Sequence, residues 1–283
     1  MQTKGCTMTY KIVSDSSSDM LTLDAVPFAS VPMTIRFGDK IFVDNADCNV
    51  PELNEYMSSY KGKSSTACPS TQDWTDAFGD ADCVFCVTLT SNLSGSYNSA
   101  RVAADEYMDA HPGRRVHVVD TLSAGPELRL VVEKLQELIL AGKEFDDIVA
   151  QIEKYHKDSK LVFALQSLHN FVANGRVSPA VGAIVGVLGL RVVGQASDVG
   201  TLQPISKPRG DRKALQEIIK LMKELGWKGG KVRIAHNNHE QQAKVLRDAL
   251  RELHNKLDVT IDHCRGLCCY YAEVGGLLVG FEG

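Results

Sequence analysis

Short apolar runs alternate with amphipathic stretches through the first half of the chain. The runs at 10–14, 82–88 and 115–119 are apolar almost throughout, which is typical of parallel strands that are covered on both faces. Residues 96–109 and 126–141 instead place their apolar side chains along one face of a helix. Strands that alternate with helices in this way predict an α/β fold with a doubly wound parallel sheet in an α/β/α arrangement.

The second half of the chain predicts another α/β unit, built on a mixed sheet. Its expected strands include 160–168 and 230–237, and its expected helices are 211–225 and 240–254. A further apolar segment, 275–281, lies at the end of the chain. The segment 201–211 contains two prolines, which cannot donate ladder hydrogen bonds, so we expect it at the edge of a sheet. We therefore expect two α/β lobes, residues 8–158 and 159–283.

Clusters of hydroxyl-bearing residues follow the predicted strands of the first half. SDSSSD (14–19), TLTSNLSGS (88–96) and DTLSAG (120–125) each stand where a strand ends. KSSTACPST (63–71) leads into a helix predicted at 70–78. Because the loops at the carboxyl ends of parallel strands line one crevice, we expect these clusters to converge on a ligand site.

Two of these hydroxyls, those of Thr66 and Ser94, precede predicted helices. A helix N-terminus offers free backbone N–H groups and a partial positive charge, and a nearby Ser or Thr hydroxyl donates a further hydrogen bond. Together these groups suit a carboxylate or a phosphate. Each residue alone also fits a plain N-cap, and it is the coincidence at several strand ends that favours a ligand site.

The sequence holds no familiar catalytic motif. It lacks the G-x-x-x-x-G-K-[ST] phosphate loop, the G-x-G-x-x-G dinucleotide fingerprint and the G-x-S-x-G nucleophile elbow. Asp15 and Asp19 do not form the Asp-x-Asp pair of phosphoryl-transfer sites, and both also fit the role of a cap or turn residue. An enzyme that uses Asp15 or a histidine stays open as the alternative, with these candidate bases: His117, His169, His236 and His239.

Eight cysteines raise the question of a metal site. Cys83 and Cys86 form a C-x-x-C, but on a strand they face opposite sides, so one metal ion cannot reach both. A closer group lies in HCRGLCC: His263, Cys264, Cys268 and Cys269. This group lacks the second paired half that zinc sites usually have, so we expect buried thiols and no metal.

Composition and charge narrow the choice of partner. Hydrophobic residues make up 44% of the 283 residues, charged residues make up 23%, and the net charge is -4, as in a globular protein with a sizeable core. This charge balance argues against a nucleic acid as the partner, because a protein that binds nucleic acid requires a basic patch on its surface. The first residues lack the apolar segment of a secretion signal, and the apolar run 177–190 is too short to span a bilayer, so we expect a cytoplasmic protein.

Motifs spread over nearly the whole chain resemble those of the DegV family, in the order in which that family has them. They are IVSDSSSD, VPMTIRFGDKIFVD, SSTACPS, LTSNLSGSYNSA, VHVVDTLSAG, NGRVS and SKPRGDRKAL. The resemblance implies a bacterial carrier that binds a long-chain fatty acid, such as palmitate, stearate or oleate, in a buried tunnel. It also implies no catalytic residue and no cofactor, a separate kinase that phosphorylates the presented carboxylate, and transient contact with a membrane.

The resemblance further implies roles for single residues. Thr66 in TACPS and Ser94 in LSGSY match the positions that hold the carboxylate. Arg176 in NGRVS and Arg209 in KPRGDRK match arginines expected near the head group or at the kinase contact, and Tyr271 stands where the family often has a histidine. Three loop residues are expected to complete the site: Ser16, Ser91 and Gly95.

One departure from the family pattern and one further resemblance bear on the expected function. Ala67 and Cys68 stand where the family has Ser and Gln, which changes the polarity expected of the pocket. The family's fold also resembles the substrate lobe of dihydroxyacetone kinases, which bind their substrate through a histidine. A small-molecule phosphotransferase or hydrolase is therefore the alternative to a fatty-acid carrier.

Overall fold

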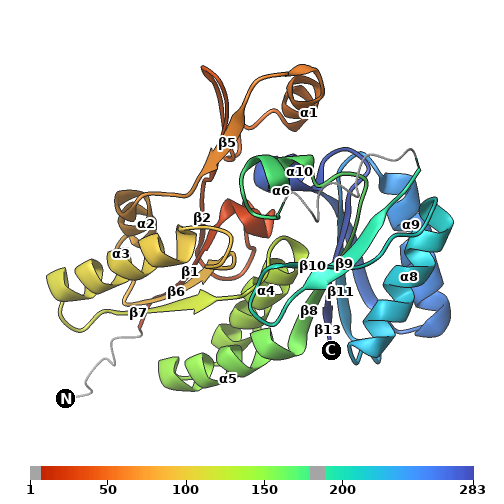
Figure 1. The fold of residues 1–283 in the computed structure, drawn as a ribbon. Helices are drawn as coiled ribbons and strands as arrows, with labels where there is room; N and C mark the ends of the chain where they lie inside the picture. The colour runs from red at the N-terminus through yellow and green to blue at the C-terminus, as the bar shows by residue number, and fades with distance from the viewer. Residues whose placement is uncertain (1–7, 179–188) are drawn as a thin grey trace, which may run out of the picture.

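Four parallel strands form the sheet that the sequence predicts for the first half of the chain. The computed structural model describes residues 8–178 and 189–283 (Figure 1). The strand order is β2-β1-β6-β7, and all pairings are parallel, which confirms the predicted sheet. Its strands are β1 (Tyr10–Asp15), β2 (Phe28–Val31), β6 (Cys83–Thr88) and β7 (Arg115–Asp120).

Helices cover both faces of this parallel sheet, which confirms the doubly wound arrangement. α2 (Thr71–Phe78) and α3 (Ser96–Ala110) pack on the face that carries Val84. α4 (Pro126–Leu140) packs on the opposite face, which carries Phe85. The sheet is therefore buried on both sides, as its apolar strands require.

The second half forms a mixed six-stranded sheet, as predicted. Its strand order is β10-β9-β8-β13-β11-β12. β11 and β12 pair in parallel, and the other pairings are antiparallel. The proline-containing strand β10 lies at the edge, as expected. The strands are β8 (Ser159–Leu165), β9 (Val192–Ala196), β10 (Leu202–Ser206), β11 (Lys231–His236), β12 (Asp258–His263) and β13 (Leu277–Glu282).

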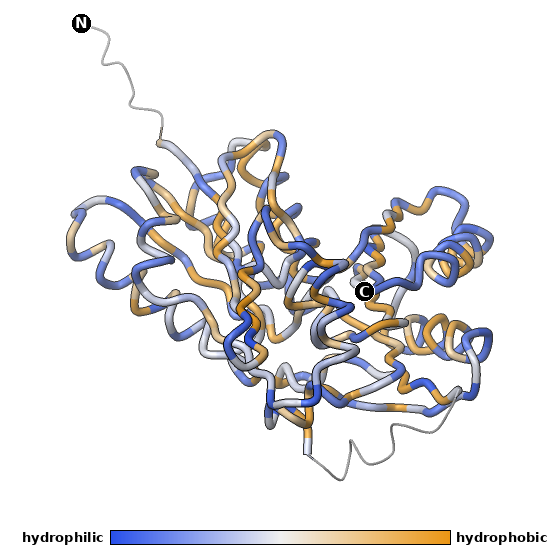
Figure 2. The backbone as a smooth tube through the Cα atoms, turned by 90° about the horizontal axis from the view of Figure 1, so that it is seen from above, coloured by the Kyte–Doolittle hydropathy of each residue, from blue (hydrophilic) through white to orange (hydrophobic). Residues whose placement is uncertain are grey.

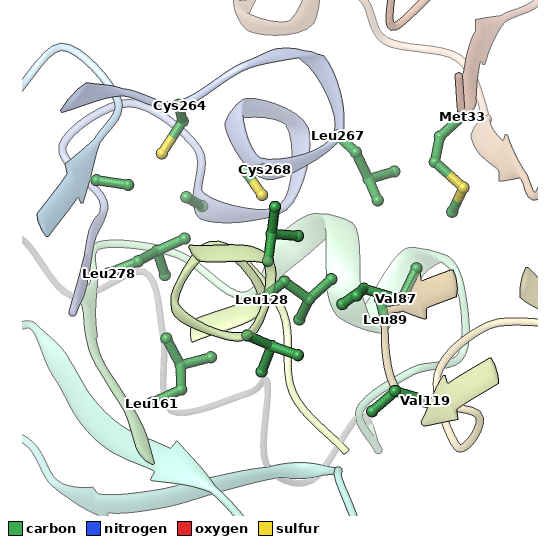
Figure 3. Close-up of a cluster of buried hydrophobic side chains, with 14 of the residues drawn as sticks. Met33, Val87, Leu89, Val119, Leu128, Leu161, Cys264, Leu267, Cys268 and Leu278 are labelled. Carbon is green, nitrogen blue, oxygen red and sulfur yellow. The ribbon is translucent and has the colours of Figure 1, made fainter. Parts of the chain in front are cut away.

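The helix α4 joins the two sheets through a common core. α8 (Asp211–Glu224) and α9 (Glu240–Leu253) cover one face of the mixed sheet, whereas α4 packs on the other, with α5 (Phe145–Asp158) beside it. Figure 3 shows Leu128 of α4 among side chains from both halves of the chain: Leu89, Leu161 and Leu278. The two expected lobes thus share one hydrophobic core, and their boundary at 158/159 stays a prediction.

The sequence does not predict a small antiparallel sheet that stands above the parallel one in Figure 1. Its order is β4-β3-β5, and α1 (Val50–Ser59) lies between β4 and β5 in the chain. Strands of four residues are too short for an alternating pattern to identify them. They are β3 (Thr34–Phe37), β4 (Lys40–Val43) and β5 (Ser64–Ala67).

Buried polar groups fix α10 (Gly266–Ala272), a helix of the second half, to the first half. The Asp44 carboxylate accepts hydrogen bonds from the backbone N–H groups of Gly266 and Leu267, at 2.8 and 2.9 Å. The amides of Asn54 and Asn237 exchange two hydrogen bonds of 2.7 and 2.8 Å across the same junction. Since buried polar groups are stable only when they are paired, these contacts hold α10 in one position.

The apolar run 177–190 lies mostly outside the residues that the structure describes. Within the described part of the chain, every helix is too short or too polar to cross a lipid bilayer.

Candidate functional site

A cavity lies between the carboxyl edge of the parallel sheet and one face of the mixed sheet. Its volume is about 290 Å³, close to the lower end of the range of about 300–1,000 Å³ that is usual for small-molecule pockets. Polar loops after three parallel strands reach it: Ser17 follows β1, Thr90 follows β6 and Ser123 follows β7. The structure thus brings together loops that lie far apart in the sequence, at the edge where the strand pattern expects a ligand.

Apolar side chains from alternate positions of β8 form one wall of this cavity. Leu161, Phe163 and Leu165 line it, because successive side chains of a strand point to opposite faces. Val162 and Ala164 instead belong to the core beneath α8 and α9. Neighbouring strands and α10 extend the apolar wall: Ala196, Leu202, Leu267, Ala272 and Leu278.

Five of the predicted site residues line the same cavity: Thr66, Ser94, Gly95, Arg176 and Tyr271. The hydroxyl oxygens of Thr66 and Tyr271 lie 2.8 Å apart. Arg176 Nε donates a hydrogen bond of 3.2 Å to the carbonyl oxygen of Leu93, the residue before Ser94. These contacts bring hydroxyl groups and one guanidinium together at one end of the cavity, where Gly95 also lies.

The polar end carries a positive charge that no carboxylate of the described residues balances. Arg176 is half-buried, and its guanidinium donates to the carbonyl oxygens of Leu93 and Asn174 but forms no ion pair within 8–178 and 189–283. Burial raises the pKa of Tyr271, while Thr66 and the charge of Arg176 act in the opposite direction. Hydroxyl and guanidinium groups are hydrogen-bond donors, so this end of the cavity suits an anion.

Thr66 precedes the predicted helix, as expected, but it reaches the cavity from a strand and does not cap that helix. It lies on β5, and Ser70 is the residue that caps α2. The short β5 strand has no pattern from which this placement follows. Ser94, by contrast, lies directly before α3, where its Oγ accepts a hydrogen bond of 3.2 Å from the Ser96 N–H.

Three predicted site residues do not line the cavity. Ser16 Oγ accepts a hydrogen bond from the backbone N–H that precedes β3, at 3.0 Å, and Ser17 lines the cavity in its place. The Ser91 N–H donates to Asp120 Oδ1 at 3.1 Å. Arg209 is exposed, in the segment between β10 and α8.

Asp15 organises the loops and does not border the cavity. Its buried carboxylate accepts hydrogen bonds from Leu89 N (2.9 Å), Ser96 Oγ (2.7 Å) and Ser17 N (3.2 Å). It therefore ties the ends of β1 and β6 to the start of α3, which is the cap role that the sequence left open. The described residues that line the cavity include no carboxylate, nor any of the candidate bases: His117, His169, His236 and His239.

The structure confirms that Cys83 and Cys86 point to opposite sides of their strand. Cys83 and Cys86 belong to core clusters on opposite faces of the parallel sheet. Cys269 Sγ donates to the carbonyl oxygen of Cys264 at 3.0 Å and lies 4.0 Å from His263 Nδ1. Among the residues that the structure describes, no group of three or more His, Cys, Asp or Glu side chains is placed to hold a metal ion. The thiols of this group are buried: Cys264, Cys268 and Cys269.

Residues that the sequence analysis does not assign to the site complete the cavity wall, on α10 and on the turn between β9 and β10. α10 contributes Leu267, Cys268 and Ala272 beside Tyr271. It has seven residues and is apolar on nearly every side, so no amphipathic period identifies it. The turn between β9 and β10 contributes Gly200, and this turn does have a signal, the glycine in SDVGT.

Gly200 brings this turn into close contact with the loops of the parallel sheet. Its φ is +73°, and a Cβ atom there would lie 2.1 Å from Thr90 Oγ1 and 2.9 Å from Leu122 Cα. Replacing Gly200 with alanine is therefore expected to lower the free energy of unfolding by about 2 kcal/mol, because backbone strain and overlap add up. Urea denaturation measures this loss. Gly142→Ala is the control, since Gly142 has a φ of +67° with open space around it. Equal losses in the two variants would contradict the packing argument.

A second cavity, of about 330 Å³, continues from the first. The two cavities share Ser123, Leu161 and Ala196 in their walls. The second one adds Glu127, which is 1% exposed and accepts a hydrogen bond from Ser159 Oγ. Burial raises the pKa of Glu127 to about 7, although Ser159 and Ser123 act in the opposite direction.

Glu127→Gln is expected to flatten the dependence of stability on pH. The pKa of Glu127 is raised from 4.5 to about 7, so between these values the folded protein holds a proton that the unfolded chain releases. The wild-type protein therefore loses stability as the pH rises from about 5 to 7, by on the order of 3 kcal/mol. A neutral glutamine removes this loss. Urea denaturation of the wild-type protein and of Glu127→Gln at pH 5 and pH 8 measures this loss. If both proteins show the same dependence of stability on pH, the assignment to Glu127 is wrong.

Comparison with known sequences finds relatives along the whole chain. A family model described as "Uncharacterised protein, DegV family" matches residues 9–281. A DegV domain-containing protein of Streptococcus pneumoniae strain R6 is 41% identical over 279 residues, which cover 97% of this chain and 99% of that protein. A DegV domain-containing protein of Streptococcus gordonii is 42% identical over 280 residues, with the same shares of 97% and 99%.

Solved structures share the fold closely. The Streptococcus pneumoniae fatty acid kinase (Fak) B3 protein loaded with linoleic acid has a TM-score of 0.95 and 41% identity, over 97% of this chain and 99% of that one. A DegV family protein from Eubacterium eligens loaded with heptadecanoic acid has a TM-score of 0.95 and 39% identity, over 97% and 99%. Since both matches cover nearly the full chain, they include the elements that form the cavity.

Proposed function

Because this chain belongs to the DegV family, we propose that it binds a long-chain fatty acid in the first cavity, the one with the apolar wall along β8. The carboxylate lies at the end formed by Thr66, Ser94, Arg176 and Tyr271, and the acyl chain runs along β8. The observation that carries this proposal is one cavity that has an apolar wall and an end where hydroxyls gather beside an arginine. The relatives loaded with linoleic acid and with heptadecanoic acid support it.

The energetics of such binding depend on both ends of the ligand. Burying an acyl chain contributes about 0.8 kcal/mol per methylene, so a palmitate-sized tail contributes on the order of 10 kcal/mol before the costs of association are subtracted. A carboxylate buried without donors would cancel several kcal/mol of this gain. Hydrogen bonds from Thr66 and Ser94, together with the charge of Arg176, offset that penalty.

We further propose that the protein presents the bound carboxylate to a separate fatty acid kinase and catalyses no step itself. The described residues that line the first cavity include no histidine and no carboxylate that would act as a general base, and the likeness to a protein named Fak B3 supports a kinase partner. Arg209, which is exposed, is the proposed kinase contact. A cytoplasmic carrier that touches the membrane transiently to exchange its ligand fits this role.

Lipid analysis of the purified protein tests the proposed ligand. The protein is isolated from bacteria, washed and denatured, and the released lipid is quantified by mass spectrometry. We expect about one long-chain fatty acid per chain, and delipidated protein should bind added fatty acid again. Protein that releases no fatty acid and also fails to bind it after delipidation would overturn the proposal.

A further inference from the structure

The proposed carboxylate end and the polar wall of the second cavity lie at opposite ends of β8. At the start of the strand, Ser159 donates a hydrogen bond to Glu127. Beyond its other end, the ring of Phe171 packs on Tyr271, with 4.6 Å between the ring centres. A strand rises about 3.3 Å per residue, so the seven residues of β8 separate these two polar regions by roughly 20 Å. An acyl chain that starts at the carboxylate end and follows β8 therefore has its tail directed toward Glu127.

Two buried polar atoms in this second region have no hydrogen-bond partner among the described residues. They are Ser123 Oγ and Glu127 Oε2, in side chains that are 6% and 1% exposed. The Ser123 hydroxyl lowers the pKa of Glu127 as a weak side-chain hydrogen bond does, but neither Ser123 Oγ nor Glu127 Oε2 has a partner at full hydrogen-bond geometry among the described residues. Buried polar atoms without a partner are costly, and an apolar chain terminus would not relieve that cost.

The walls of the two cavities show how a ligand reaches these atoms. Ser123 and Leu161 border both cavities, so a tail that passes Leu161 meets Ser123 at the junction. Lys157 and Asp198, which are exposed, also line the second cavity. A polar group at the end of the tail thus has both room and hydrogen-bonding groups in this place.

We propose that this junction is a subsite for an oxygen-bearing tail, and that the protein accepts long-chain fatty acids with a hydroxyl group at or near the methyl end. A hydroxyl group both donates and accepts, so it pairs with Glu127 Oε2 and Ser123 Oγ at once. A methyl terminus at the same place leaves both atoms unpaired. The inference rests on the proposed function, since it requires the carboxylate to lie at the Thr66 end.

Paired ligands separate this inference from the proposed function. Delipidated protein is titrated with hexadecanoic acid and with ω-hydroxyhexadecanoic acid, which have the same length. If the end of the tunnel is purely apolar, the hydroxy acid binds about tenfold or more weakly than hexadecanoic acid, because its hydroxyl group is buried without a partner. We expect the hydroxy acid to bind at least as tightly as the plain acid. Tight binding of hexadecanoic acid with tenfold weaker binding of the hydroxy acid would overturn the inference and leave the proposed function standing. Failure of both acids to bind would remove the premise and the inference with it.

Two serine variants locate the hydroxyl subsite. Ser123→Ala is expected to shift the ratio of the two Kd values about tenfold against the hydroxy acid, because one hydrogen bond to its tail is lost. Ser94→Ala is the matched control, since it removes a hydroxyl at the other end and should weaken both acids equally. A ratio that stays unchanged in Ser123→Ala, or that moves equally in both variants, would overturn the assignment of the subsite to the junction.

Discussion

Asp15→Ala is expected to lower the free energy of unfolding by about 4 kcal/mol or more. The buried carboxylate of Asp15 accepts hydrogen bonds from Ser17, Leu89 and Ser96, and alanine leaves these donors unpaired in the interior. Each unpaired buried donor costs about 1–3 kcal/mol. The loss falls on the loops that carry the proposed head-group residues, so the variant should also bind fatty acid less tightly.

Urea denaturation followed by circular dichroism measures the effect of Asp15→Ala. Asp39→Ala serves as the control, because Asp39 is exposed and its loss should change the free energy of unfolding by no more than about 0.5 kcal/mol. A loss below about 1 kcal/mol in Asp15→Ala would show that the hydrogen bonds of this carboxylate do not hold the loops together.

The double variant Thr66→Ala/Ser94→Ala is expected to lose at least about 100-fold in fatty-acid affinity. Hydrogen bonds to a charged group contribute about 1.5–3 kcal/mol each, so two of them account for two orders of magnitude or more. The loss should be much smaller for a fatty alcohol of the same length, which carries no charge. Titration of delipidated protein with both ligands measures the difference.

Two exposed serines provide a control for this double variant. Ser58 and Ser59 lie on α1, where their hydroxyls bond to backbone carbonyl oxygens of the same helix. Ser58→Ala/Ser59→Ala should bind fatty acid as the wild-type protein does. If the Thr66/Ser94 variant keeps the wild-type affinity as well, the carboxylate is held by other groups.

The sequence predicts the parallel sheet because its strands are buried on both faces. Such burial favours runs that are apolar almost throughout. β1 and β6 show these runs within one residue of their ends, and so does β7, the half-buried strand at the edge of the sheet. The sequence pattern does not predict the antiparallel strands β3, β4 and β5. Each of them has four residues and owes its position to contacts with α1 and α10. Local pattern specifies an element only where burial extends over more than one turn or several strand residues.

The candidate site is predictable in part for a similar reason. Loops after successive parallel strands must share an edge, so the convergence of the segments that carry Ser17, Thr90 and Ser123 follows from strand order. The position of Thr66 on β5 and the approach of Gly200 to Thr90 depend on tertiary contacts that no periodicity encodes. The sequence does not predict the burial of Glu127, for another reason. An acidic residue in the first turn of a helix is usually exposed to solvent, where its charge stabilises the N-terminus of the helix.

A crystal structure of the delipidated protein soaked with hexadecanoic acid tests the central claim most directly. We predict continuous density along β8, with the carboxylate within hydrogen-bond distance of Thr66 and Ser94 and with the tail at the junction near Ser123. A carboxylate bound at another place, or tightly packed side chains where the acyl chain should run, would contradict the account.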